Sequence, residues 1–66
     1  MQVSIFNPHH LDRHTVQEIR DLAVQQPIFH NDLESTLFFF DFKYKDYWVS
    51  SLLINNDLKS MIIEIN

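Results

Sequence analysis

The 66-residue sequence contains no glycine and no cysteine, and each absence excludes a group of structures and functions. Without glycine, the phosphate-cradling loops of nucleotide-binding proteins are excluded, both the Walker A motif and the dinucleotide fingerprint. Tight turns must use asparagine, aspartate or longer loops. Without cysteine, there are neither disulfide bonds nor thiolate metal ligands. The remaining ways to staple so small a fold are a histidine or carboxylate metal site and burial against another chain.

Long apolar runs and basic charge are also scarce. No apolar stretch approaches the roughly 20 residues that a membrane-spanning helix requires, and the first residues lack the pattern of a signal peptide. We therefore expect a cytoplasmic protein, of a bacterial or infected host cell, with no membrane contact. The five Lys and Arg residues are scattered and the net charge is −4. Direct nucleic-acid binding is not expected, because tracking a phosphate backbone needs a basic stripe.

What the sequence does contain is apolar. Hydrophobic residues make up 45 % of the chain and aromatic residues 14 %, which is typical of a globular protein and not of a disordered one. The length allows one domain, residues 1–66. A core of this size rarely contributes more than about 3–5 kcal/mol of stability.

The first half of the chain predicts a strand followed by a helix. Val3 and Ile5 alternate with polar residues, which is typical of a strand over residues 2–6. Apolar residues then recur at helical spacing, which predicts a helix over about residues 12–26, ended by Pro27. The apolar positions of this helix are Val16, Ile19, Leu22 and Ala23.

The N-terminus of this helix has competing starts. Thr15 and Glu18 match a capping box, in which each side chain satisfies the backbone amide of the other residue. Asp12 and the Asn7-Pro8 pair offer starts further upstream. The sequence leaves these starts open.

The second half of the chain predicts a three-stranded meander over about residues 36–44, 47–54 and 59–65. Lys45-Asp46 is the first turn, and residues 55–57 (Asn-Asn-Asp) make a three-residue second loop, since asparagine tolerates the left-handed conformation needed there. We therefore predict an α+β domain with the order β-α-β-β-β. Its one helix packs on one face of a mainly antiparallel sheet.

The Lys45-Asp46 turn places Tyr44 opposite Tyr47 and decides which residues share a face of the sheet. One face then forms the core beneath the helix. In this register, with a three-residue second loop, Glu64 lies near Trp48 on the other face. The predicted core face collects Phe38, Phe40, Phe42 and Tyr44 from the first strand of the meander and Met61, Ile63 and Ile65 from the last.

The second face is also apolar, although one helix covers only one face. Burying a large apolar side chain contributes about 1.5–3 kcal/mol, and contiguous exposed apolar patches mark association surfaces. We therefore predict a partner interface here, with Trp48 as an aromatic anchor beside Asp41 and Lys43. The predicted interface residues are Leu37, Phe39, Asp41, Lys43, Trp48, Leu52 and Ile54.

Three arrangements would change this interpretation. The first strand or the segment Ile28-Phe29 would cover part of the second face if it folded over it. A one-residue slip in the loops would exchange the faces of the last strand. If the second face stays open, a symmetric homodimer is the first partner to consider and a foreign protein the second.

Histidines cluster around the start of the predicted helix. His10 and His14 are four residues apart, the spacing that puts two imidazoles on one helix face, with His9 and Asp12 nearby and His30 beyond the helix. The HExxH motif is missing, and short motifs often mislead. We interpret these residues as surface histidines, with His10 and His14 as weak candidates for a metal, and predict no cofactor.

Catalytic motifs are missing as well. No serine lies in a Gly-x-Ser-x-Gly elbow. Asp41 and Glu64 share the second face as a possible carboxylate pair, but charges on strands usually serve solubility. A sheet with one helix leaves no room for the clefts of about 300 Å³ or more that substrates need. We predict that the protein is not an enzyme.

The predicted helix and the residues after it are acidic. The charges are Glu18, Asp21, Asp32 and Glu34. The ordinary interpretation is a solvated helix face. The alternative is a secondary acidic surface at Glu18 and Asp21 that docks into a basic groove and raises the association rate.

These features favour a small protein-binding module that occludes a larger protein or protein complex. The composition is typical of AT-rich bacterial and phage genomes, and by analogy suggests an inhibitor of the anti-defence, immunity or antitoxin kind. The alternative is a structural subunit that self-associates through the second face. A third hypothesis is a regulator stapled by a metal at His9, His10, His14 and His30.

Overall fold

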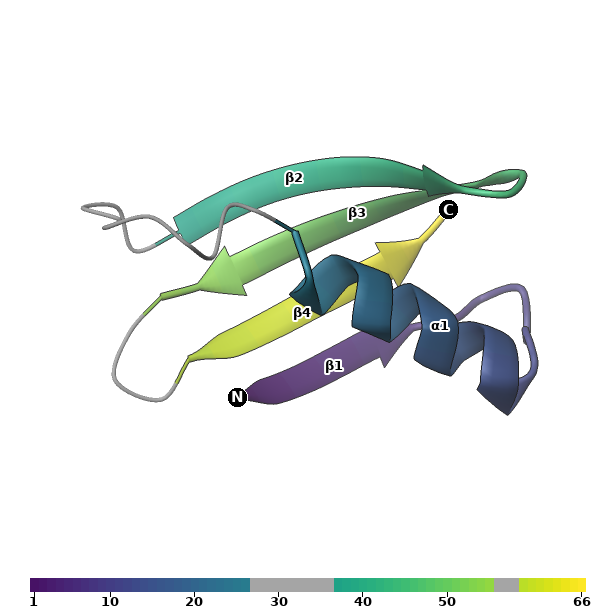
Figure 1. Cartoon of the computed structure of the whole chain (residues 1–66), viewed down its shortest axis with the longest axis horizontal. Coiled ribbons are helices and arrows are strands. Elements are labelled where there is room, and N and C mark those ends of the chain that lie inside the picture. Colours follow the sequence, from purple (N-terminus) through teal and green to yellow (C-terminus); the bar gives the residue numbers. More distant parts are fainter. Residues whose placement is uncertain (27–36, 56–58) are drawn as a thin grey trace.

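The computed structural model describes residues 1–26, 37–55 and 59–66, and the remaining residues lie outside the described part. Within the described residues, one helix and four strands follow each other in the order β-α-β-β-β (Figure 1). The elements are β1 (Gln2–Phe6), α1 (Arg13–Val24), β2 (Leu37–Tyr44), β3 (Tyr47–Ile54) and β4 (Ser60–Ile65). The predicted α+β class and element order are confirmed.

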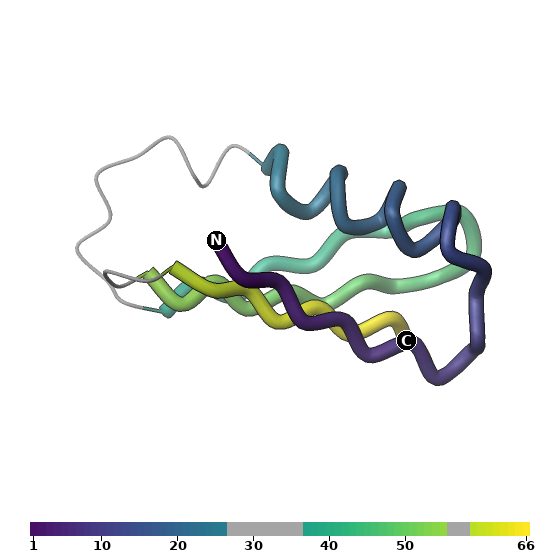
Figure 2. The backbone as a smooth tube through the Cα atoms, turned by 90° about the horizontal axis from the view of Figure 1, so that it is seen from below, coloured from purple at the N-terminus to yellow at the C-terminus, as the bar shows by residue number. Residues whose placement is uncertain are grey.

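The four strands form one mixed, mostly antiparallel sheet with the order β1-β4-β3-β2. β1 is parallel to β4, whereas β3 is antiparallel to both β4 and β2. β1 and β2 are therefore the two outer strands, and the chain passes from one edge of the sheet to the other between them. α1 belongs to this crossing and lies on one side of the sheet (Figure 2).

α1 begins at Arg13 because Asp12 caps it. Asp12 has an extended backbone (φ −68°, ψ 165°), and its carboxylate accepts a hydrogen bond of 2.7 Å from the amide of Thr15. The capping box predicted at Thr15 and Glu18 does not form, because Thr15 lies inside the first turn and donates its amide to Asp12, while Glu18 accepts a hydrogen bond from Tyr44 on β2. The helix therefore uses the upstream start.

The loop between β1 and α1 is held by Asn7. The Asn7 side chain donates to the Leu11 carbonyl and accepts from the Leu11 amide, both at 3.0 Å. His10 in this loop adopts a φ of 54°, which is uncommon for a residue other than glycine. Lys45 and Lys59 do the same at φ values of 53° and 42°, so this glycine-free chain makes its sharp turns with larger residues.

The β2–β3 hairpin has the predicted register, with Tyr44 opposite Tyr47. Lys45 and Asp46 form the two-residue turn between them. The Lys45 ammonium nitrogen lies 5.5 Å from the centre of the Tyr44 ring, a cation–π contact beside the turn. Because the side-chain period of a strand is two, this turn decides the face of every residue in the hairpin.

The β3–β4 connection is longer than predicted. Ile54 lies opposite Ser60, so five residues connect the strands and the predicted three-residue loop is wrong. The two-residue difference leaves both faces unchanged, because it equals one full side-chain period. It does change neighbours: Glu64 lies opposite Ser50, not beside Trp48.

The core lies between α1 and the predicted face of the sheet. Ile19 and Ala23 of α1 are fully buried, whereas Leu22 is 40 % exposed and was wrongly predicted as a core position. Leu22 lies at the flank of the apolar stripe, because Ile19 and Ala23 face the sheet directly. The buried hydrophobic residues are Ile19, Ala23, Tyr44, Val49, Leu53, Met61, Ile63 and Ile65.

One polar side chain is buried among these residues. The Ser51 hydroxyl on β3 has no hydrogen-bond partner in the part of the chain that the structure describes. It faces the core between Phe40 and Ile63, its cross-strand neighbours. A buried hydroxyl without a partner is costly, so this position weakens the core that α1 covers.

The adjacent residues Ile63 and Ile62 test the division of β4 between the two faces. Ile63 is fully buried under α1, whereas Ile62 is half-buried on the other face. We expect Ile63→Val to lower the free energy of unfolding by about 0.5–1.5 kcal/mol, and Ile62→Val to lower it less, because it leaves no enclosed cavity. Urea denaturation of both variants measures the difference, and equal losses would contradict the assignment of faces.

Candidate interaction surface

The face of the sheet that points away from α1 is called the open face here. By register, it carries the odd-numbered residues of β2 and the even-numbered residues of β1, β3 and β4. Figure 2 shows α1 on the opposite side of the sheet. Within residues 1–26, 37–55 and 59–66, no helix or strand packs over the open face.

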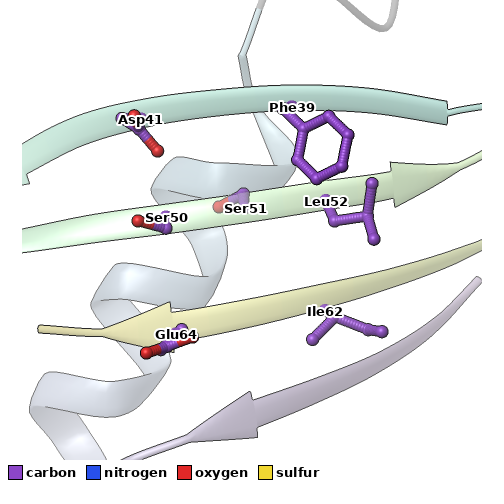
Figure 3. Close-up of a pocket in the computed structure, with 7 residues that line it drawn as sticks. All are labelled: Phe39, Asp41, Ser50, Ser51, Leu52, Ile62 and Glu64. Atoms are coloured by element: carbon purple, nitrogen blue, oxygen red, sulfur yellow. The ribbon is translucent and has the colours of Figure 1, made fainter.

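An apolar row crosses the open face from β2 to β4. Phe39 lies opposite Leu52, and Leu52 lies opposite Ile62, as Figure 3 shows. Phe39 is 76 % exposed, the most exposed large apolar side chain of the described residues. Leu37, at 51 %, and the half-buried Ile54 extend the apolar area in the next row toward the start of β2.

A polar row borders the apolar row on its other side. Asp41 lies opposite Ser50, and Ser50 lies opposite Glu64, and all three side chains appear together in Figure 3. The Asn66 side-chain amide donates a hydrogen bond of 3.0 Å to the Ser50 hydroxyl. Asp41 and Glu64 belong to strands that are not neighbours, so their backbones are roughly 10 Å apart. The two carboxylates form a rim to the apolar row.

Trp48 and Lys43 form the last row, next to the hairpin turn. They lie opposite each other, and the Trp48 ring is 57 % exposed. The Trp48 carbonyl accepts a hydrogen bond of 2.8 Å from the Asn66 amide, which holds the C-terminal residue against β3. The aromatic ring is thus fixed on a paired strand while its surface stays accessible.

Shallow hollows accompany these rows. One of about 230 Å³ lies over the two rows of Figure 3, and one of about 510 Å³ lies beside Phe6, Asn7, Pro8 and Glu64. The second exceeds the size that we expected a sheet with one helix to leave, because the β1–α1 loop rises beside the end of β4. The Phe6 side chain in its wall is 61 % exposed, so the hollow is open to solvent.

The structure brings all seven predicted interface residues onto the open face. Leu37, Phe39, Asp41 and Lys43 lie on β2, and Trp48, Leu52 and Ile54 lie on β3. Phe6 was not among the predicted interface residues, yet it lies opposite Glu64 on the same face. The signal was present in the alternation that points Val3 and Ile5 toward the core, because that alternation directs Phe6 to the opposite side.

Two arrangements that would have changed the open face, cover by the first strand and a one-residue slip of the last strand, do not occur. β1 does not fold over the open face, because it pairs with β4 at the edge of the sheet. β4 has not slipped by one residue against β3, since Met61 and Ile63 are buried on the core face. The segment Ile28-Phe29 lies outside the described residues.

A second polar cluster ties the first half of α1 to the hairpin. The Tyr44 hydroxyl donates a hydrogen bond to the Glu18 carboxylate, and the His14 Nε2 atom lies 3.2 Å from the other Glu18 oxygen. The hydrogen bond from Tyr44 lowers the pKa of Glu18 below its ordinary value of 4.5. The same bond raises the pKa of Tyr44 above its ordinary value of 10.0.

This cluster bears on the secondary acidic surface expected at Glu18 and Asp21. The Glu18 carboxylate is engaged by Tyr44 and His14. Asp21 accepts a hydrogen bond of 2.9 Å from the Gln17 side chain, and an Arg20 nitrogen lies 3.8 Å from it. Both carboxylates therefore already have partners within the chain, which makes α1 a weaker electrostatic target than the sequence suggested.

The histidines do not share a helix face. His10 precedes α1 in the loop, and His14 pairs with Glu18, while the His9 ring packs against Tyr47 with 5.0 Å between ring centres. Among the described residues, no three His, Cys, Asp or Glu side chains are grouped closely enough to hold a metal ion. His30 lies outside the described part.

The sequence matches no protein-family model, no curated protein and no solved structure. In the described part of the chain, no helix is long and apolar enough to cross a membrane.

The bond between Tyr44 and Glu18 predicts how stability depends on pH. Because the folded-state pKa of Glu18 is lowered, its contribution is present above about pH 4.5 and is lost as the pH falls through the folded-state pKa. Because the pKa of Tyr44 is raised, the contribution is present below about pH 10 and is lost as the pH rises through the folded-state pKa. We expect Tyr44→Phe to flatten both flanks of the stability profile.

Urea midpoints between about pH 3 and pH 11 measure this profile. Tyr47→Phe is the matched control, because it removes a tyrosine hydroxyl from the same hairpin and leaves the Glu18–Tyr44 bond in place. Parallel profiles for wild type and Tyr44→Phe would contradict the role given to this bond.

Proposed function

We propose that this protein is a non-catalytic protein-binding module whose open face contacts a larger protein and occludes part of it. Inhibitors of the anti-defence, immunity or antitoxin kind act in this way. The observation that carries the proposal is Phe39, which projects from a regular strand into solvent at the head of a row of apolar side chains.

The free energy available on this face is substantial. Fully burying one large apolar side chain contributes about 1.5–3 kcal/mol, and Phe39, Leu37 and Trp48 are each more than half exposed. An aromatic residue on a rigid strand loses little conformational freedom on binding, which is why Trp and Tyr dominate interface hot spots. Folding alone gives no reason for three such side chains to share one face.

Charge surrounds the apolar area in the pattern of a protein interface. Asp41, Glu64 and Lys43 border it, while Phe39, Leu52 and Ile62 form its centre. Fully apolar centres with polar rims are typical of specific protein–protein contacts. Carboxylates at the rim favour a target surface with complementary basic groups.

Self-association through the open face is the second candidate. The row of Phe39, Leu52 and Ile62 would pack against the same row of a second molecule in a face-to-face sandwich. The molecule measures 34 × 19 × 16 Å, so such a contact covers a footprint of roughly 600 Å² per partner, below the ~800 Å² of a standard interface. A larger target that also contacts the surrounding loops fits this size better.

Substitutions on the open face should abolish partner binding and leave the fold intact. We expect Phe39→Ser and Trp48→Ala each to lose the partners that the wild-type chain recovers from its native host, because each removes an exposed anchor. Leu22→Ser is the matched control, because Leu22 is an exposed apolar residue on α1, on the other side of the sheet. Circular dichroism confirms that each variant folds.

Recovery of the same partners by Phe39→Ser and Trp48→Ala would contradict the proposal. Trp48 supplies an independent signal, since it is the only tryptophan of the chain and is 57 % exposed. Its fluorescence should shift to shorter wavelength when a purified partner covers it. A partner that binds with no change in the emission of Trp48 would show that the contact lies elsewhere.

A further inference from the structure

We infer that β2 is a dimerisation edge, at which β2 of a second copy pairs antiparallel about a twofold axis through Phe42. β2 is an outer strand of the sheet, and in the described part of the chain its only paired neighbour is β3. Eight consecutive residues, Leu37–Tyr44, pair with β3 in unbroken register and contain no proline. A long, regular, apolar outer strand is a template for pairing with another chain.

The other edge of the sheet is protected in the way that natural proteins protect edges. β1 has only five residues, Gln2–Phe6, and Pro8 follows closely after its end. Short outer strands and adjacent prolines prevent pairing between molecules. β2 has neither of these devices, and its two charged residues, Asp41 and Lys43, have opposite signs and can pair across a twofold axis. This asymmetry between the two edges points to β2 as the edge that is used.

The backbone of β2 offers the required hydrogen-bonding groups. The Trp48 carbonyl accepts from the Asn66 amide on the β4 side of β3, so the alternate residues Tyr47 and Val49 direct their backbone groups toward β2. Their β2 partners are Tyr44 and Phe42. The intervening residues of β2, Asp41 and Lys43 among them, therefore direct their N–H and C=O groups to the outer edge.

The side chains on the core side of β2 are also incompletely covered. Phe38, Phe40 and Phe42 lie on the face that α1 covers, yet all three are only half-buried. In Figure 1, α1 lies over β4 and β1 and not over the length of β2. In the register with the axis at Phe42, residues 40–44 of the two β2 strands pair. Phe42 then lies opposite its own copy and Phe40 opposite the partner's Tyr44, whereas Phe38 lies beyond the paired residues.

Charge selects the register. Asp41 and Lys43 are the only charged residues of β2 and point to the same face. When a twofold axis relates two antiparallel copies of one strand, side chains that face each other lie on the same side of the sheet only if one residue lies opposite its own copy. The axis is named after that residue. An axis at Phe42 places Asp41 opposite the partner's Lys43 and Lys43 opposite the partner's Asp41, whereas an axis at Asp41 places two carboxylates face to face. An axis at Phe40 leaves both charges opposite apolar residues.

The dimer enlarges the surface on which the proposed function rests, although the inference does not depend on that function. The twofold axis is perpendicular to the sheet, so both helices lie on one side and both open faces lie on the other. The strand order becomes β1-β4-β3-β2 followed by β2-β3-β4-β1 of the partner. The footprint of the open face doubles to roughly 1,200 Å², which exceeds the ~800 Å² per partner of a standard interface.

Charge reversal tests the register directly. Asp41→Lys creates two contacts between lysines in the dimer, and Lys43→Asp creates two contacts between aspartates. Each variant should dimerise at least roughly tenfold more weakly than the wild type, because like charges directly opposite each other across strands are destabilising. The double variant Asp41→Lys/Lys43→Asp restores both pairs and should dimerise like the wild type. An equimolar mixture of the two single variants should form a heterodimer.

Sedimentation equilibrium over a range of concentrations measures these constants, with circular dichroism of each variant as the folding control. Both side chains are exposed, so the reversals should leave the monomer folded. Restored dimerisation in the double variant and in the mixture supports the register. Failure of both to dimerise overturns the register, and a wild type that remains monomeric at millimolar concentration overturns the dimer.

A single cysteine separates edge pairing from face-to-face packing. The chain has no cysteine, so Phe42→Cys introduces a unique thiol on the twofold axis, where Cα atoms about 4.5 Å apart permit a disulfide. Oxidation should link this variant into a covalent dimer. Phe39→Cys is the control, since residue 39 and its copy lie roughly 20 Å apart in this register. Cross-linking at position 39 and not at 42 would overturn edge pairing in favour of face-to-face packing.

Discussion

The width of a helix is the constraint on which the rest of this molecule depends. An α-helix with its side chains is about 10 Å across and covers about two strands, since neighbouring strands are about 4.8 Å apart. The described part of the chain has one helix and four strands. α1 lies over β4 and β1 (Figure 1), so it does not extend over β2 at the far edge, and it covers only one face of the sheet. Because the helix covers so few strands, the phenylalanines on the core side of β2 are only half-buried and Phe39 on the other side is exposed.

The polar contacts of α1 show how the fold compensates. The Tyr44 hydroxyl reaches from the end of β2 to Glu18, and the Lys45 ammonium group lies over the Tyr44 ring. These contacts join the helix to the far strand at the hairpin end, where Tyr44 is the one buried residue of β2. The helix is thus fixed to β2 by a hydrogen bond at one end and to β4 by packing of Ile19 and Ala23.

Local patterns carried most of the prediction of the fold. Alternation located β1, helical spacing located α1, and the Lys45-Asp46 turn fixed the register of β2 against β3, which in turn placed seven candidate residues on one face. One error arose between two competing local signals. Asp12 and Thr15 each offered a helix start, and the Asp12 carboxylate accepts the Thr15 amide that the capping box would have used.

The other errors arose where the deciding contact is distant in sequence. Leu22 matched the helical stripe, but the direction in which α1 faces the sheet is set by packing and not by spacing. The length of the β3–β4 loop depends on how β4 meets β3 along its whole length, and a three-residue loop is only the shortest solution. The alternation of β1 directs Phe6 away from the core, but its place beside Glu64 on the open face comes from the parallel pairing of β1 with β4, which is a contact distant in sequence.

The alternation of side chains along β2 lets the strand tolerate substitutions but not insertions or deletions. The core constrains one set of β2 residues, Phe38, Phe40 and Phe42, and contacts on the open face constrain the other, Leu37 and Phe39. The two sets alternate along one strand. Point substitutions at the odd positions can change what the surface recognises without rebuilding the fold. A single inserted or deleted residue would exchange the two sets, so a lineage of such proteins is free to vary by substitution in β2 and is held to a constant strand length.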